Sequence, residues 1–114
     1  MRTKIDTSGI QFQVAATPTA KKDYRDKTSQ ARTLDGRPVW TVRLTAIDTV
    51  HETTETIWVE VAGDEPRLTF NGFAVVQELV YAPWVGKDGK IRRAFRAETV
   101  VMATANGKTA VHAA

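Results

Sequence analysis

The chain has 114 residues, of which 42% are apolar and 25% charged, and it contains no cysteine. This length indicates one domain over residues 1–114, and the lack of cysteine excludes disulfides and thiolate metal sites. No window reaches the roughly 18 apolar residues of a membrane span, and no secretory signal is seen. We therefore expect a cytoplasmic protein with no membrane partner, and the net charge of +3 favours an anionic one.

Three segments in the first part of the chain alternate apolar and polar residues, which is the period of a half-buried β-strand. They are residues 10–14, 39–47 and 56–61. Thr17-Pro18 is expected to end the first strand, because proline cannot donate a ladder hydrogen bond.

Two longer strands are predicted at residues 73–84 and 91–102, joined by a hairpin at Asp88-Gly89. Residues 103–114 are expected to form a flexible tail. Five main strands and no convincing helix predict an all-β fold, a five-stranded antiparallel OB-fold-like barrel with long basic loops. A small sandwich fits the same strand count.

The loop before the second strand is crowded with charge. It carries one aromatic, Tyr24, three aspartates and six cations, which are Lys21, Lys22, Arg25, Lys27, Arg32 and Arg37. Cations beside an aromatic suit single-stranded nucleic acid, whose phosphates attract charge and whose unpaired bases stack on rings.

A second basic cluster surrounds the last hairpin, where Asp88 is the only acid among five cations. These cations are Lys87, Lys90, Arg92, Arg93 and Arg96. One interpretation is a charged edge that blocks strand-to-strand aggregation. The other is phosphate binding, since two basic loops on one small domain can line one groove.

The aromatic residues divide between core and binding roles. Trp58 lies opposite the apolar face of its strand and is the tryptophan expected to be exposed as a stacking platform, with an edge or dimer contact as the alternative. Tyr24 and Trp84 are further stacking candidates, while the core is favoured for Trp40 and either role is open for Phe95. Three residues are assigned to the core, namely Phe12, Phe70 and Phe73.

Catalysis has little support in the sequence. The two histidines, His51 and His112, form no ligand cluster with carboxylates, and no Gly-rich phosphate loop precedes a helix. We therefore expect a protein that is not an enzyme and has no cofactor and no metal site.

The order of these features resembles the gene-V type single-stranded DNA-binding proteins of phages and plasmids. A basic loop ends in Asp35-Gly36-Arg37-Pro38-Val39-Trp40, a second strand follows at residues 56–61, and a glycine-containing hairpin at residues 86–90 precedes the closing strand. The Pro38-Val39-Trp40 block also resembles actinobacterial plasmid replication, integration and excision activators.

The gene-V resemblance implies an OB-like barrel, a homodimer and sequence-tolerant coating of single strands. It places DNA contacts at Tyr24, Arg32, Arg37 and Arg93, with Trp40 and Phe95 as further candidates. With the cations named above, Arg43 completes the expected phosphate contacts.

The sequence thus predicts a non-catalytic protein that binds single-stranded DNA, or RNA, in phage or plasmid replication or transfer. The alternatives are a mobile-element regulator or adaptor that binds duplex DNA or a protein, an enzyme or small-ligand domain that uses the mouth of the barrel, and a structural barrel of an assembly.

Overall fold

The computed structural model describes residues 3–22, 28–85 and 87–103. In this part of the chain the fold is all-β, with no helix. Its strands are β1 (Thr3–Lys4), β2 (Ile10–Ala20), β3 (Val39–Asp48), β4 (Thr53–Ala62), β5 (Phe73–Gln77), β6 (Val80–Tyr81), β7 (Trp84–Val85), β8 (Ile91–Arg92), β9 (Phe95–Arg96) and β10 (Thr99–Met102).

Eight strands form one curled sheet in the order β1-β6-β9-β4-β3-β2-β5-β10, and β7 and β8 form a separate ribbon. The long strands β2, β3 and β4 make an antiparallel meander, and β3 and β4 stay in register from Val39↔Ala62 to Asp48↔Thr53. β9 pairs with β4 in parallel, whereas β5 pairs antiparallel with both β2 and β10. Within the meander, the β3–β4 pairs are close in sequence, whereas β2 pairs with β3 across the long connection between them.

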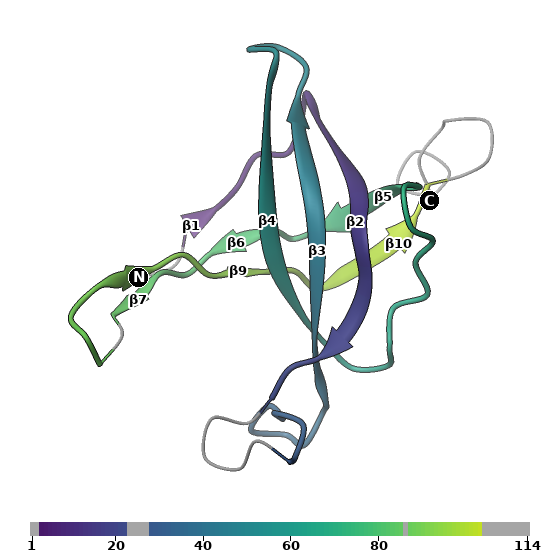
Figure 1. Cartoon of the computed structure of the whole chain (residues 1–114). Helices are drawn as coiled ribbons and strands as arrows, with labels where there is room; N and C mark the ends of the chain where they lie inside the picture. Colours follow the sequence, from purple (N-terminus) through teal and green to yellow (C-terminus); the bar gives the residue numbers. More distant parts are fainter. Residues whose placement is uncertain (1–2, 23–27, 86, 104–114) are drawn as a thin grey trace.

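The hydrophobic core lies between the meander and the short strands that cross behind it (Figure 1). Alternation places every second side chain of the long strands in this core. The most completely buried side chains are Val14, Val42, Leu44 and Val59. The short strands contribute Ala74, Val76, Phe95 and Val100 from the other side. The predicted inward faces of residues 39–47 and 56–61 are confirmed.

β2 continues through Thr17-Pro18, so the prediction that this dipeptide ends the strand is wrong. The pairing of β2 with β3 shifts register between Val14 and Ala16 and again between Ala16 and Thr19. Pro18 lies within the second shift, and bulges are where a strand tolerates a residue with no N–H to donate.

The two predicted long strands are each interrupted. Residues 73–84 are split into β5, β6 and β7, and Glu78 lies between β5 and β6 with a φ of 54°. Residues 91–102 are split into β8, β9 and β10. An unbroken strand would keep one set of partners, but these segments change partner along their length. Five continuous strands are therefore replaced by more and shorter ones.

Two aromatic residues assigned to the core lie on the surface. Phe70 is exposed in the connection between β4 and β5, and Phe73 is exposed at the start of β5. Phe73 pairs with Gln13, whose side chain lies on the face of β2 opposite the buried Phe12. Phe12 is buried as predicted. Of the predicted tail, only Ala103 lies among the described residues.

Candidate nucleic-acid interface

The face of the meander turned away from the core carries an exposed tryptophan. We call this surface of β2, β3 and β4 the outer face. Trp58 points to it because its neighbours Ile57 and Val59 are buried on the core side, and 55% of Trp58 is exposed. The expected exposure of this residue is confirmed. A rigid indole on a sheet has the surface that base stacking requires.

Arg43 lies directly opposite Trp58 in the β3–β4 register. Its guanidinium is exposed and donates a hydrogen bond of 3.4 Å to the carbonyl of Ala15 on β2. Ala15 lies at the first register shift of β2. The Arg43 side chain therefore extends over β2, away from Trp58. The guanidinium and the indole occupy neighbouring positions on the outer face and do not stack on each other.

A carboxylate on the same face joins two of the predicted phosphate contacts. Glu60 follows Trp58 by two residues on β4 and forms an ion pair with Lys21, whose Nζ lies 2.7 Å from Oε2. On the other side, Arg96 Nε is 3.7 Å from Oε1 of Glu60. Arg96 reaches this position because it is the register partner of Glu60 in the parallel β4–β9 pair. The base of the first basic loop and the closing segment thus meet at Glu60.

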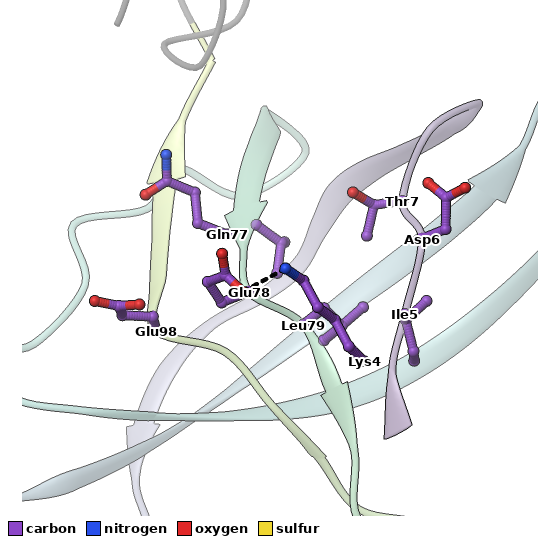
Figure 2. Close-up of a pocket in the computed structure, with 9 residues that line it drawn as sticks. Lys4, Ile5, Asp6, Thr7, Gln77, Glu78, Leu79 and Glu98 are labelled. Carbon is purple, nitrogen blue, oxygen red and sulfur yellow. Dashed lines mark ion pairs between the residues drawn. The ribbon is translucent and has the colours of Figure 1, made fainter. Parts of the chain in front are cut away.

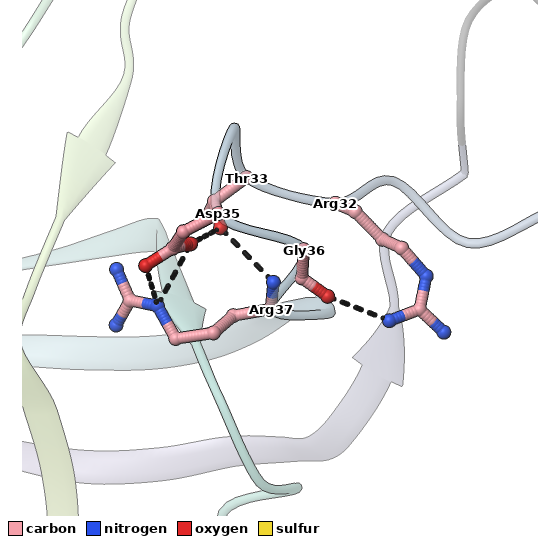
Figure 3. A network of polar contacts seen from close by, with 5 residues as sticks. All are labelled: Arg32, Thr33, Asp35, Gly36 and Arg37. Atoms are coloured by element: carbon pink, nitrogen blue, oxygen red, sulfur yellow. Dashed lines mark hydrogen bonds and ion pairs between the residues drawn. The ribbon is translucent and has the colours of Figure 1, made fainter.

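Residues 32–38 fold back as a short hairpin, which we call the Leu34 hairpin (Figure 3). The amide of Gly36 donates to the carbonyl of Thr33, and that of Thr33 to the carbonyl of Arg37. Gly36 has a φ of +88°, which closes a three-residue turn at little steric cost. Leu34 is fully exposed at its tip.

Side chains fix the conformation of the Leu34 hairpin (Figure 3). Asp35 accepts hydrogen bonds from the Thr33 hydroxyl and, at 3.1 and 3.2 Å, from Nε of Arg37. The Thr33 hydroxyl, followed by Arg37, lowers the pKa of the Asp35 carboxyl below its ordinary value. Arg32 donates to the carbonyl of Gly36 at 2.8 Å. The two predicted arginines therefore flank the exposed leucine.

The second basic cluster spreads over two environments. Lys87 and Lys90 are exposed beside the turn of the β7–β8 ribbon, which projects away from the sheet (Figure 1). Arg93 instead hydrogen-bonds Glu55, and its guanidinium lies 5.4 Å from the ring centroid of Phe95. The side chains of Trp84 and Arg92 lie outside the described part of the structure, and both residues are in the ribbon.

The predicted contacts therefore fall into separate groups. Arg43 and Trp58 lie on the outer face, and Lys21 and Arg96 adjoin it where they contact Glu60. Arg32 and Arg37 lie in the Leu34 hairpin, and Lys22 is exposed where it bridges to Gln30. The tip of the ribbon and the Leu34 hairpin project in different directions (Figure 1). Tyr24, Arg25 and Lys27 lie outside the described residues.

Two aromatic residues of open role have packing contacts. Trp40 is half-buried and donates its indole N–H to the carbonyl of Gly63 at 2.9 Å, which ties the start of β3 to the end of β4. Phe95 is 9% exposed and its ring centroid is 5.2 Å from that of Tyr81. Neither ring offers the open face that Trp58 does.

An open cleft of ≈ 750 Å³ lies beside β1 (Figure 2). Lys4 is ion-paired with Glu78 there at 3.0 Å, and two further carboxylates, Asp6 and Glu98, also line the cleft. One cation against three acids makes this surface unsuited to phosphate.

At the β3–β4 turn, the His51 amide, followed by the His51 ring, lowers the pKa of Asp48.

Searches of the described residues for other sites give two negative findings. No group of three or more His, Asp or Glu side chains there is arranged to hold a metal ion. No helix long and apolar enough to cross a membrane occurs in the same residues.

The sequence analysis did not single out two residues of the candidate interface, Leu34 and Glu60. Leu34 has a signal, because it is the one large aliphatic residue in a polar loop and directly precedes Asp35-Gly36. Glu60 has the weaker signal of sharing the exposed face of its strand with Trp58. Its contacts with Lys21 and Arg96 depend on chain segments far apart in sequence, which no local pattern predicts.

Comparison with protein-family models, with curated proteins and with solved structures finds no match for this chain. The function must therefore be argued from the surface itself.

Proposed function

We propose that this protein binds single-stranded nucleic acid, DNA in the first place, through the outer face and without catalysis. The observation that carries the proposal is the 55% exposed Trp58 in a surface that also holds Arg43, Lys21 and Arg96. An aromatic platform among cations can bind bases and phosphates of any sequence. Arg32, Arg37 and the exposed Leu34 extend this surface at the end of the meander.

The proposal includes an OB-like barrel as the finer description of the fold. It is supported by the pairing of β2 with both β3 and β5, and by a closing segment that pairs with β4 through β9 and with β5 through β10. OB-folds bind oligonucleotides on the face of their second and third strands and at two flanking loops. In this description β3 and β4 are the second and third strands, and the described parts of the β2–β3 and β6–β9 connections lie at the two loops.

The test measures binding of labelled oligo(dT), an oligoribonucleotide and a duplex by fluorescence anisotropy at two salt concentrations. Single strands are expected to bind more tightly than the duplex, and added salt to weaken binding, since each neutralised phosphate releases counterions. Intrinsic tryptophan fluorescence should change on binding. A strong preference for the duplex would instead favour a mobile-element regulator, and no binding to any of the three would refute the proposal.

A homodimer and a role in phage or plasmid replication or transfer remain part of the proposal, and they rest on the resemblance of the sequence. Light scattering coupled to size-exclusion chromatography, with and without oligonucleotide, measures the mass of the free and bound protein. A monomer in both states would refute the dimer and leave the binding surface untouched.

A further inference from the structure

The anion held between Lys21 and Arg96 in this structure is the protein's own Glu60. The Glu60 side chain is only 23% exposed, whereas the side chains of Lys21 and Arg96 are 40% and 51% exposed. One oxygen contacts Lys21 at 2.7 Å, and the other lies 3.7 Å from Arg96. Each cation therefore directs part of its charge at one acceptor and keeps a solvent-facing surface.

This cluster lies on the same face as the exposed indole. Glu60 follows Trp58 by two residues on β4, so their side chains are neighbours on the outer face at the ordinary spacing of a strand. The register partner of Glu60 on β3 is Thr41. A nucleotide stacked on Trp58 thus brings its backbone phosphate close to this cluster.

We propose that Lys21 and Arg96 form a subsite for a backbone phosphate, and that the Glu60 carboxylate occupies it in the free protein. This inference rests on the proposed function and adds to it a specific phosphate position and a residue that lowers affinity. A bound phosphate takes over the two cations from the carboxylate. Glu60 then keeps binding weak and exchangeable, because part of the favourable charge interaction already exists before the ligand arrives.

The competing interpretation is that Glu60 only positions the cations for the ligand. The two interpretations predict opposite changes in affinity for a single strand when the Glu60 carboxylate is removed. If Glu60 competes with phosphate, its removal tightens binding; if it positions Lys21 and Arg96, its removal weakens binding.

The experiment compares wild type with Glu60→Gln, which keeps the size of the side chain and removes its charge. Oligo(dT) affinity is measured by anisotropy over a series of NaCl concentrations. We expect binding about 3- to 10-fold tighter at low salt, as for the loss of two competing surface ion pairs. The plot of log K against log salt should steepen by up to about 0.7, since Lys21 and Arg96 then neutralise one backbone phosphate of a single strand more completely.

The matched control is Glu78→Gln. Glu78 is also paired with a lysine, Lys4 at 3.0 Å, and its substitution changes the net charge equally, but it lies at the β1–β6 edge of the sheet. Its effect measures the general gain from one lost negative charge. Thermal unfolding of both variants establishes that each is folded.

A second measurement tests the cations directly. In a Lys21→Ala, Arg96→Ala background, Glu60→Gln should give no gain beyond that of the Glu78 control. If Glu60→Gln gives no more than the control in the wild-type background, or weakens binding, the subsite proposal is overturned while the proposed function stands. If wild type itself binds no single strand, the proposed function fails first and the subsite with it.

Discussion

Arg43 and Trp58 are register partners on neighbouring strands, yet the guanidinium bonds the carbonyl of Ala15 on β2 and leaves the indole open. A cation stacked on the ring would have blocked the surface that a base needs. Because the arginine extends the other way, a charged position and a stacking position lie next to each other on one face.

The indole of Trp58 should supply a large share of binding. We expect Trp58→Ala to weaken oligo(dT) binding about 5- to 150-fold, the equivalent of one stacked base at about 1–3 kcal/mol. Anisotropy measures the affinity. Phe70→Ala is the matched control, since Phe70 is an equally exposed aromatic in the β4–β5 connection. Equal losses in both variants would contradict a specific platform.

Replacement of Arg43 should change the salt dependence of oligo(dT) binding and leave the fold intact. Arg43→Ala removes one phosphate contact, so the slope of log K against log salt should become shallower by about 0.7. The control is Arg67→Ala, which removes the same charge from an exposed position between β4 and β5. An unchanged slope in the Arg43 variant would remove this residue from the interface.

The Leu34 hairpin should depend on the ionised carboxylate of Asp35. Its pKa is lowered by the Thr33 hydroxyl and then by Arg37, so the folded state favours the charged form. The network is fully present above the ordinary aspartate pKa of about 3.9, and it is lost as the pH falls through the lowered value. The amide NMR signal of Arg37 should report this transition, because that amide donates to the Thr33 hydroxyl.

Asp35→Asn should abolish this transition in the Arg37 signal, whereas Asp64→Asn, on the β4–β5 connection, should leave it unchanged. If the Arg37 amide signal of Asp35→Asn kept the wild-type chemical shift at neutral pH, the backbone alone would hold the hairpin.

The core prediction concerns Leu44, which is fully buried in the centre of the meander. Leu44→Ala should lower the free energy of unfolding by about 2–5 kcal/mol, because a buried leucine leaves a cavity behind. Urea denaturation measures the change. Val50→Ala, at an exposed position of the β3–β4 turn, should change it by no more than about 0.5 kcal/mol.

The sequence predicted the meander well because its signal is local. Alternation alone assigned the buried faces around Leu44 and Val59 and the exposure of Trp58, all of which the structure bears out. The same rule failed after residue 70, where Phe73 is exposed and Glu78 adopts a positive φ. Strands that exchange partners along their length do not keep one period, so alternation cannot locate their breaks.

The candidate site was predictable in its residue types but not in its arrangement. Charge counting placed Lys21 and Arg96 in two separate basic clusters, but it could not reveal that both contact Glu60. It also grouped Arg93 with Arg96, although Arg93 contacts Glu55 and Arg96 contacts Glu60. Whether a cation is already paired depends on tertiary contacts, and no composition or spacing encodes them.

The parallel pairing of β9 with β4 has a consequence for the order of folding. The hairpin of β3 and β4 pairs residues at most 23 positions apart, whereas the Glu60↔Arg96 pair joins residues 36 positions apart and the Ile10↔Asp48 pair of β2 with β3 joins residues 38 positions apart. Contacts of long sequence separation form late, because closing a long loop costs entropy before it brings stabilisation. The hairpin of β3 and β4 would then present Trp58 and Arg43 first, and Lys21 and Arg96 would reach Glu60 later.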